Sequence, residues 1–330
     1  MKPFTFRAPL AVALAAVLTA TCASAQQAAA SSATVARPPR IPPGTTASYM
    51  VFDRVTGKAT LGYKVHSRFR SASVVKILIA LDHLESREPG TAIPARDRGL
   101  LSRMLRSSDD DAASALWSRG GRAAIITRMV RRVGLTDTGP PPASKPGFWG
   151  YTALSAADVV RTYRYLFDRA NPQVRDLILG HLREATRCAT DDFDQYFGIP
   201  SAVPRPWAVK QGWSGYGSTP AVRCAGTRTS SLRQAAAETD ATDTAATAEA
   251  RTTGTAGAAE AETTGAAGTA EARPGVNLIR PVLHTTGVVG KGDRLIVVVL
   301  TLQPAGSSFT SSAARLTALT RDVHRAALPK

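Results

Sequence analysis

The sequence predicts a mixed α/β (α+β) fold in which strands near both chain ends flank a long helical middle. Strand-like alternation marks residues 47–52 and 59–65, and it returns at residues 206–213, 282–289 and 294–302. Between these two groups, the apolar residues recur at helical spacing. With 44% hydrophobic residues in a chain of 330, there is enough apolar material for one large domain or two small ones.

The chain is organised around a serine at the start of a predicted helix. After the hairpin of residues 47–65, the sequence reads Phe-Arg-Ser-Ala-Ser-Val-Val-Lys from residue 69 and continues as the apolar run 77–81. If Ser73 opens this helix, Lys76 lies one turn later on the same face, where its amine can take the proton of the Ser73 hydroxyl. Ser71 is five residues from Lys76 and lies off that face.

The middle of the chain, about residues 77–203, is expected to form a helical subdomain. Gly134 ends the helix predicted from residue 122, Ser155 caps the helix that runs to residue 167, and Pro172 begins the next one. An amphipathic helix over residues 312–327 closes the chain. The helical part therefore separates the two groups of strands in the sequence.

The first 45 residues predict export and a tether. Residues 1–25 have basic residues, then the apolar run 8–20 and an Ala-Ser-Ala site, which is typical of a secretory signal peptide too short to span a membrane. Lipid attachment at Cys22 is the alternative, but threonines stand where a lipobox has leucine and a small residue, so simple secretion is favoured. Residues 26–45 are rich in Ala and Pro and predict an extended linker.

A low-complexity insert interrupts the C-terminal strands at about residues 230–272. It consists almost entirely of Ala, Thr, Glu, Gly and Asp, so it has too little apolar bulk to fold and is expected to be disordered. It holds seven acidic and two basic residues, which leaves the rest of the chain more basic than the total of +16 indicates. A basic exported protein is attracted to an anionic cell wall, and the absence of basic runs interleaved with aromatics argues against nucleic acid.

Two cysteines, Cys188 and Cys224, remain after removal of the signal peptide. An exported protein favours one disulfide between them, and two separate buried thiols are the alternative. The five histidines are scattered, and neither a His-Glu-x-x-His motif nor a Gly-x-Ser-x-Gly motif occurs. We therefore expect neither a metal site nor another cofactor.

Three motifs carry the resemblance to a known family. Ser73-Val74-Val75-Lys76, Ser108-Asp109-Asp110 and Lys210-Gln211-Gly212 stand in this order, and together they resemble the S-x-x-K, S-D-N and K-T-G signature of the class A-like serine β-lactamases and penicillin-binding DD-peptidases. The resemblance covers roughly residues 46–328. It implies a single domain over residues 46–330, with an antiparallel sheet built from both chain ends and an active site between that sheet and the helical subdomain.

The resemblance also implies a role for each motif. Ser73 would be the acylated nucleophile and Lys76 its base. Ser108 would relay a proton to the leaving group, and Lys210 would support Ser108 and bind the substrate carboxylate. The backbone N–H groups of Ser73 and Trp213 would form the oxyanion hole. Substrates would be β-lactams or D-Ala-D-Ala-like peptides of peptidoglycan, and the protein would act as a monomer.

The residues expected to bind substrate depart from the family pattern at two positions. Asp110 replaces the asparagine that holds the substrate amide, and Gln211 replaces a hydroxyl residue that helps to bind the carboxylate. Gly212 and Trp213 complete this predicted substrate-binding set. A decayed site on a cell-wall-binding module of the same fold is therefore the alternative to an active enzyme.

The connection at residues 136–150 lacks the glutamate that activates the deacylating water in class A β-lactamases. Asp137 is its only carboxylate, and nothing in the sequence assigns Asp137 to the acyl bond. We therefore expect Ser73 to be acylated and the acyl-enzyme to be hydrolysed slowly. This favours penicillin binding or peptidase-like activity over efficient destruction of antibiotics.

Overall fold

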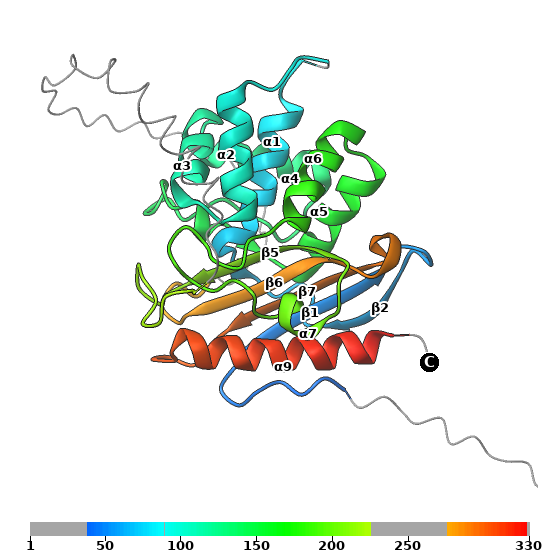
Figure 1. The fold of residues 1–330 in the computed structure, drawn as a ribbon, viewed down its shortest axis with the longest axis vertical. Coiled ribbons are helices and arrows are strands. Elements are labelled where there is room, and N and C mark those ends of the chain that lie inside the picture. Colours follow the sequence, from blue (N-terminus) through cyan, green and yellow to red (C-terminus); the bar gives the residue numbers. More distant parts are fainter. Residues whose placement is uncertain (1–37, 89, 226–275, 329–330) are drawn as a thin grey trace, which may run out of the picture. The chain divides into compact units, whose positions relative to one another are not determined.

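The computed structural model of the chain describes residues 38–88, 90–225 and 276–328. In Figure 1, a five-stranded sheet lies between a group of helices on one side and, on the other, the C-terminal helix α9 (Phe309–Ala327) with the short helix α7 (Ile199–Ala202) beside it. The predicted signal peptide, most of the linker and the low-complexity insert lie outside the described residues.

The sheet is antiparallel throughout and is built from both ends of the chain. Its order is β2-β1-β7-β6-β5, so the N-terminal hairpin pairs directly with β7 near the C-terminus. Its strands are β1 (Thr46–Asp53), β2 (Lys58–Tyr63), β5 (Trp207–Ser214), β6 (Val282–Val289) and β7 (Leu295–Leu302). This confirms the predicted fold class, and it leaves β5 as an edge strand that faces the start of the nucleophile helix.

The side chains of the central strand β7 point alternately to the two faces of the sheet, which explains why both faces are covered. Ile296, Val298 and Leu300 belong to the core beneath the helical group, and their neighbours Val297 and Val299 pack beneath α9. Successive side chains of a strand point to opposite faces, so a strand with apolar residues at every position needs cover on both sides. The sheet is therefore the middle of three layers.

The helices follow the predicted order with small shifts at their ends. The helical elements are η1 (Ala72–Val75), α1 (Lys76–Glu85), α2 (Ala95–Arg106), α3 (Asp110–Arg119), α4 (Ala123–Val133), η2 (Trp149–Tyr151), α5 (Ala156–Asp168), α6 (Pro172–Arg183), α7 (Ile199–Ala202), η3 (Lys291–Asp293) and α9 (Phe309–Ala327). A short second sheet joins β3 (Phe69–Arg70) to β4 (Ala153–Leu154). Helix α9 begins three residues before the predicted start because Ser308 caps it by accepting a hydrogen bond from the backbone of Ser311.

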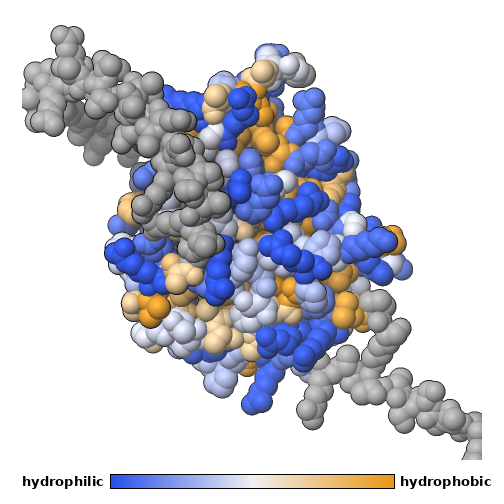
Figure 2. Space-filling model, in the orientation of Figure 1, coloured by the Kyte–Doolittle hydropathy of each residue, from blue (hydrophilic) through white to orange (hydrophobic). Residues whose placement is uncertain are grey.

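Helix α1 is the centre of the helical layer. Residues 77–81 are all buried, with neighbouring helices α2, α3, α4 and α6 packed around them. A helix that is apolar on every side belongs in a core, and the outer helices carry the charged residues instead. On the face shown in Figure 2, hydrophilic side chains accordingly cover most of the surface. Within the described part of the chain, no helix is long and apolar enough to cross a lipid bilayer.

Buried Asp158 holds the connection between α4 and β4 in place. Its carboxylate accepts hydrogen bonds from the backbone N–H groups of Thr136, Asp137 and Thr138 at 2.7–3.0 Å and pairs with Arg161 at 2.6 Å. Burial alone would raise the pKa of Asp158, but these donors lower it overall. The same connection continues to residues 147–151, which form one wall of the cleft described below.

We predict that Asp158→Asn lowers the free energy of unfolding by about 2–4 kcal/mol, because buried N–H groups lose a charged acceptor. The folded-state pKa is depressed, so this contribution is present above the unfolded value of 3.8 and is lost as the pH falls through the folded value. Denaturant unfolding at neutral and acidic pH measures both effects. The control Asp168→Asn alters an exposed pair with Arg164 and should change stability by less than about 0.5 kcal/mol.

Candidate active site

Ser73 lies in the short helix η1 at the floor of a cleft of about 600 Å³. The residue before it, Ala72, has a positive φ of 45°, an uncommon backbone conformation of the kind often found at functional sites. Ser71 is turned away, and its hydroxyl donates to the carbonyl groups of Ala72 and Gly150. Ser73 therefore faces the cleft and Ser71 does not.

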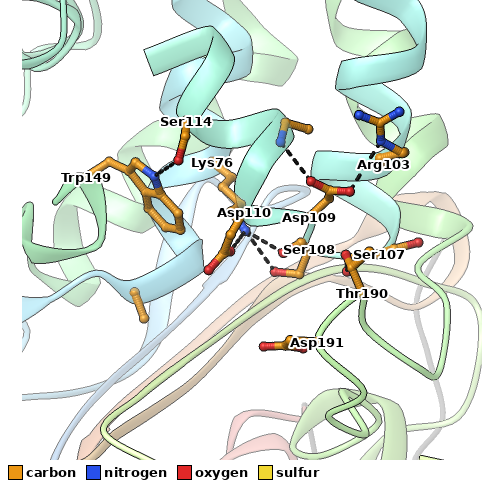
Figure 3. A network of polar contacts seen from close by, with 12 residues as sticks. Lys76, Arg103, Ser107, Ser108, Asp109, Asp110, Ser114, Trp149, Thr190 and Asp191 are labelled. Carbon is orange, nitrogen blue, oxygen red and sulfur yellow. Dashed lines mark hydrogen bonds and ion pairs between the residues drawn. The ribbon is translucent and has the colours of Figure 1, made fainter. Parts of the chain in front are cut away.

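Segments from five parts of the chain surround this cleft. Besides Ala72 and Ser73, its lining comprises Asp110 and Ser114 of α3, residues 147–151, Asp191, and residues 213–215, 217 and 218. Figure 3 shows Lys76, Ser108, Asp110 and Asp191 gathered where these segments meet. The helical layer and the edge of the sheet thus both contribute to one site.

Lys76 is fully buried and is held by the second motif. Its ammonium group donates to the Ser108 carbonyl and to Asp110 Oδ1, both at 2.6 Å, and to Ser108 Oγ at 3.3 Å (Figure 3). Burial lowers the pKa of Lys76, and the Asp110 charge opposes that shift. Among the described residues, Ser73 Oγ has no hydrogen-bond partner, so the predicted direct contact between Lys76 and Ser73 is not formed in this structure.

Lys210 also contacts Ser108. Its ammonium group donates to Ser108 Oγ at 2.9 Å and to its neighbour's carbonyl, that of Gln211, at 3.2 Å. Burial lowers the pKa of Lys210 well below its usual range, and the positive charge of Lys76 lowers it further. The structure thus joins the three motifs in one chain of contacts, from Lys76 through Ser108 to Lys210.

The Gln211 side chain, which the sequence predicts to bind substrate, is engaged elsewhere in this structure. Its amide donates to the carbonyl groups of Gln195 and Phe197, at 3.2 and 2.5 Å, on the opposite side of β5 from the cleft. Neighbouring residues on a strand alternate in direction, so Gln211 points away when Lys210 points towards Ser108. Lys210 is itself only 1% exposed and does not line the cleft, which argues against its expected contact with a substrate carboxylate.

Gly212 allows β5 to approach Ser73 closely. A Cβ atom at this position would lie 3.0 Å from the Ser71 carbonyl oxygen and 3.3 Å from the Ser73 backbone nitrogen. Those distances leave no room for a side chain, so the glycine sets how close the edge strand comes to η1. The next residue, Trp213, lines the cleft and donates its indole N–H to Asp191 Oδ2 at 3.2 Å.

Asp191 and Trp149 line the cleft, and sequence reasoning missed both. Asp191 follows α6 in a loop without a recognisable motif, and burial together with the nearby Asp110 charge raises its pKa. Trp149 donates its indole N–H to Ser114 Oγ at 3.2 Å. No local pattern identifies either residue, because each reaches the site through tertiary packing.

A disulfide between Cys188 and Cys224 lies next to Asp191. The two Cα atoms are 5.5 Å apart, within the usual range for a disulfide. The backbone N–H of Cys224 also donates to the carbonyl of Asp192 at 2.8 Å. The crosslink thus ties the loop that carries Asp191 to the segment that follows β5.

The searches against known proteins found a consistent fold and one partial sequence match. No family model matches. Over 175 residues the chain is 38% identical to the protein named "Putative lipoprotein LppW" in Mycobacterium tuberculosis and Mycobacterium bovis. That match covers 52% of this chain and 54% of LppW, so the chain spans about half the length of the curated relatives it matches.

Solved structures cover most of the chain. A class A β-lactamase from Mycobacterium abscessus matches 86% of this chain and 94% of its own, with a TM-score of 0.52 and 18% identity. A β-lactamase from Sphaerobacter thermophilus matches 87% and 94% of the two chains, with a TM-score of 0.53 and 14% identity. The protein PBP-A matches 87% and 92%, with a TM-score of 0.52 and 14% identity.

The fold is that of the class A β-lactamases. Identities of 14–18% establish the architecture, and the chemistry has to be argued from this chain's own residues. In the described residues, no group of three or more His, Cys, Asp or Glu side chains is arranged to hold a metal ion.

The connection that carries a glutamate in class A β-lactamases brings no carboxylate to this cleft. Asp137 accepts hydrogen bonds from Ser155 Oγ at 2.8 Å and lies 2.8 Å from His66 Nδ1, so it is engaged outside the site. The part of the connection that does line the cleft, residues 147–150, contains no acid. Within the described residues, the carboxylates on the cleft wall are those of Asp110 and Asp191.

We predict that Gly212→Ala lowers the free energy of unfolding by about 1–3 kcal/mol, because the new methyl group would press β5 against η1. Denaturant unfolding measures the loss. Gly99→Ala in α2 is the matched control, since a Cβ atom there meets nothing within 4 Å. Alanine also favours a helix over glycine, so Gly99→Ala should leave stability unchanged or raise it. Equal effects of the two variants would contradict this view of Gly212.

We predict that replacing both Cys188 and Cys224 with serine lowers the free energy of unfolding by about 3–4 kcal/mol, from the loop entropy released over a separation of 36 residues. The measurement is denaturant unfolding without reductant. The wild-type protein in reductant should lose a similar amount. If reduction left the midpoint unchanged, the crosslink would be absent from the folded protein.

Proposed function

We propose that the chain is an exported serine hydrolase that forms an acyl-enzyme at Ser73 with β-lactams or D-Ala-D-Ala-like peptides. The observation that carries this proposal is the chain of contacts from Lys76 through Ser108 to Lys210 beside a serine that faces a cleft. Acyl transfer needs a nucleophile, a base and a proton donor for the leaving group. These residues can supply all three.

The reaction begins with a proton shift. Lys76 is positively charged beside Asp110, and Lys210 favours the neutral form, so a proton can pass from Lys76 through the Ser108 hydroxyl to Lys210. Neutral Lys76 then takes the proton of Ser73 after a side-chain movement, and Ser73 Oγ bonds to the acyl carbon. The leaving group departs with a proton from Ser108, which Lys210 replaces, so both amines return to their starting forms.

The oxyanion that forms in this step would be stabilised by the backbone N–H groups of Ser73 and Trp213. The close approach of β5 to η1 at Gly212 supports this assignment, because it brings the edge strand next to the Ser73 nitrogen. Backbone N–H groups in fixed positions stabilise developing negative charge without reorganisation. We expect the acyl-enzyme to be hydrolysed slowly, since no residue of the connection 136–150 offers the cleft a carboxylate.

A binding module with a decayed site is the second candidate. One observation favours it: the Lys76 ammonium group binds Asp110 at 2.6 Å, and in the described part of the chain it forms no hydrogen bond with Ser73 Oγ. An ammonium group held by a carboxylate is a poor base. In this case the protein would bind peptidoglycan in the cleft and leave it uncleaved.

We place the protein outside the cytoplasm, in contact with the cell wall. The basic composition and the signal-like residues 1–25 support export. The printed name of LppW describes a lipoprotein, which puts lipid attachment at Cys22 on an equal footing with simple secretion. The wall polymer is the expected partner, and the protein is expected to act as a monomer without nucleic acid.

We predict that incubation with a fluorescent penicillin labels the wild-type protein covalently and that Ser73→Ala abolishes the label. Intact-protein mass spectrometry should show the mass of one penicillin, which persists over many minutes because deacylation is slow. Ser71→Ala is the matched control and should keep the label, since Ser71 is 1% exposed and faces away from the cleft.

Two results would count against the acyl-enzyme. Absence of any label at saturating penicillin would favour the binding module. A label that survives Ser73→Ala would assign the chemistry to another residue. Rapid multiple-turnover hydrolysis of a chromogenic cephalosporin would leave the nucleophile intact but would refute slow deacylation.

A further inference from the structure

The cleft above Ser73 is acidic, although the chain as a whole carries a formal charge of +16. Asp110 and Asp191 are the charged side chains on its wall, and no lysine, arginine or histidine lines it in the described part of the chain. Lys76 and Lys210 lie fully buried beneath this surface. A ligand in the cleft therefore meets carboxylates and does not touch the amines directly.

Both carboxylates keep an acceptor available for a ligand. Asp110 uses Oδ1 to bind Lys76, but its side chain is 67% exposed, and its second oxygen has no hydrogen-bond partner among the described residues and can face solvent or a ligand. Asp191 accepts hydrogen bonds from two neutral groups, the Trp213 indole and the Phe193 backbone, and has no ion-pair partner among the described residues. Neutral donors leave its negative charge uncompensated.

The buried amines do not cancel these charges. The charge of Lys76 is matched by Asp110 at 2.6 Å, and Lys210 donates to Ser108 Oγ and to the Gln211 carbonyl, with no ion pair to either carboxylate among the described residues. Asp191 is therefore the carboxylate of the cleft wall that has no ammonium partner among the described residues.

Two further observations indicate that a ligand belongs here. Ser73 is only 5% exposed, lines the cleft, and has a hydroxyl with no hydrogen-bond partner in the described residues. The wall opposite β5 carries Phe148, Trp149 and Tyr151, and Phe148 is 54% exposed although it is a large apolar side chain. Aromatic faces attract cations, and the Lys76 ammonium already lies 4.7 Å from the centre of the Trp149 ring.

We propose that this cleft binds the cationic group of a substrate, an ammonium or amidinium nitrogen, between the carboxylates of Asp110 and Asp191 and against the aromatic wall. That the ligand is a substrate rests on the proposed function, but the binding preference does not. The same charges oppose a ligand carboxylate, so acylation by anionic penicillins is expected to need long incubation.

The test measures binding to the Ser73→Ala protein, which keeps the cleft but cannot be acylated. The probes are benzamidine, benzamide and benzoate, which share a ring and differ in charge, and titration calorimetry at low ionic strength gives their affinities. We expect benzamidine to bind at least about tenfold more tightly than benzamide, with benzoate the weakest. Added salt should lower the affinity for benzamidine and leave the affinity for benzamide unchanged.

Variants of one loop locate the effect. Asp191→Asn in the Ser73→Ala background should reduce the preference for benzamidine about threefold or more, and Asp191→Glu should restore most of it. Asp194→Asn is the matched control: it removes the same charge from the same loop, but Asp194 pairs with Arg187 outside the cleft. The Asp194→Asn variant should keep the same preference for benzamidine as the Ser73→Ala protein.

The inference is overturned if benzoate binds as tightly as benzamidine, or if salt weakens the binding of benzamidine and benzamide alike. It is also overturned if Asp191→Asn and Asp194→Asn reduce the preference for benzamidine equally. The salt titration needs no substitution in the loop, so it tests the inference even if the loop variants fail to fold.

Penicillin labelling separates this inference from the proposed function. A cation preference without label at Ser73 refutes the acyl-enzyme alone, and a label combined with a benzoate preference refutes the cation site alone.

Discussion

The buried ammonium group of Lys76 is the constraint on which the site depends. A charge in a protein interior costs several kcal/mol unless partners surround it, and here the Ser108 carbonyl and the Asp110 carboxylate do so at 2.6 Å. Both partners come from the segment that joins α2 to α3, and Ser108 reaches Lys76 with a positive φ of 55°. These contacts therefore fix the segment between α2 and α3 against α1. They also hold Ser108 between Lys76 and Lys210.

One substitution relative to the family pattern changes the electrostatics of the whole site. An asparagine at position 110 would remove the carboxylate that contacts Lys76 at 2.6 Å, whereas Asp110 supplies that contact and adds a negative charge to the cleft wall. The burial of Lys210 beside Lys76 then favours a neutral second amine. Asp110 and Asp191 thus place two carboxylates on the cleft wall, on a fold shared with class A β-lactamases at 14–18% identity.

Much of the architecture could be predicted from local patterns. The strand predicted at 282–289 has those bounds in the structure, Gly134 ends α4 in a left-handed conformation, and Ser155 caps α5. These features depend on neighbours within a few residues, so periodicity and capping rules identify them. The first turn at Ser73 was less predictable: it is a 3₁₀ turn, and α1 proper begins only at Lys76.

The sequence by itself determined the order of strands and helices and the three motifs, because each is written in a few consecutive residues. Only the tertiary structure decided the rest of the site. Packing turned Gln211 towards the carbonyl groups of Gln195 and Phe197, and it brought Asp191 to the cleft. The direction of a side chain on an edge strand and the path of a loop depend on contacts between distant segments, which no local spacing records.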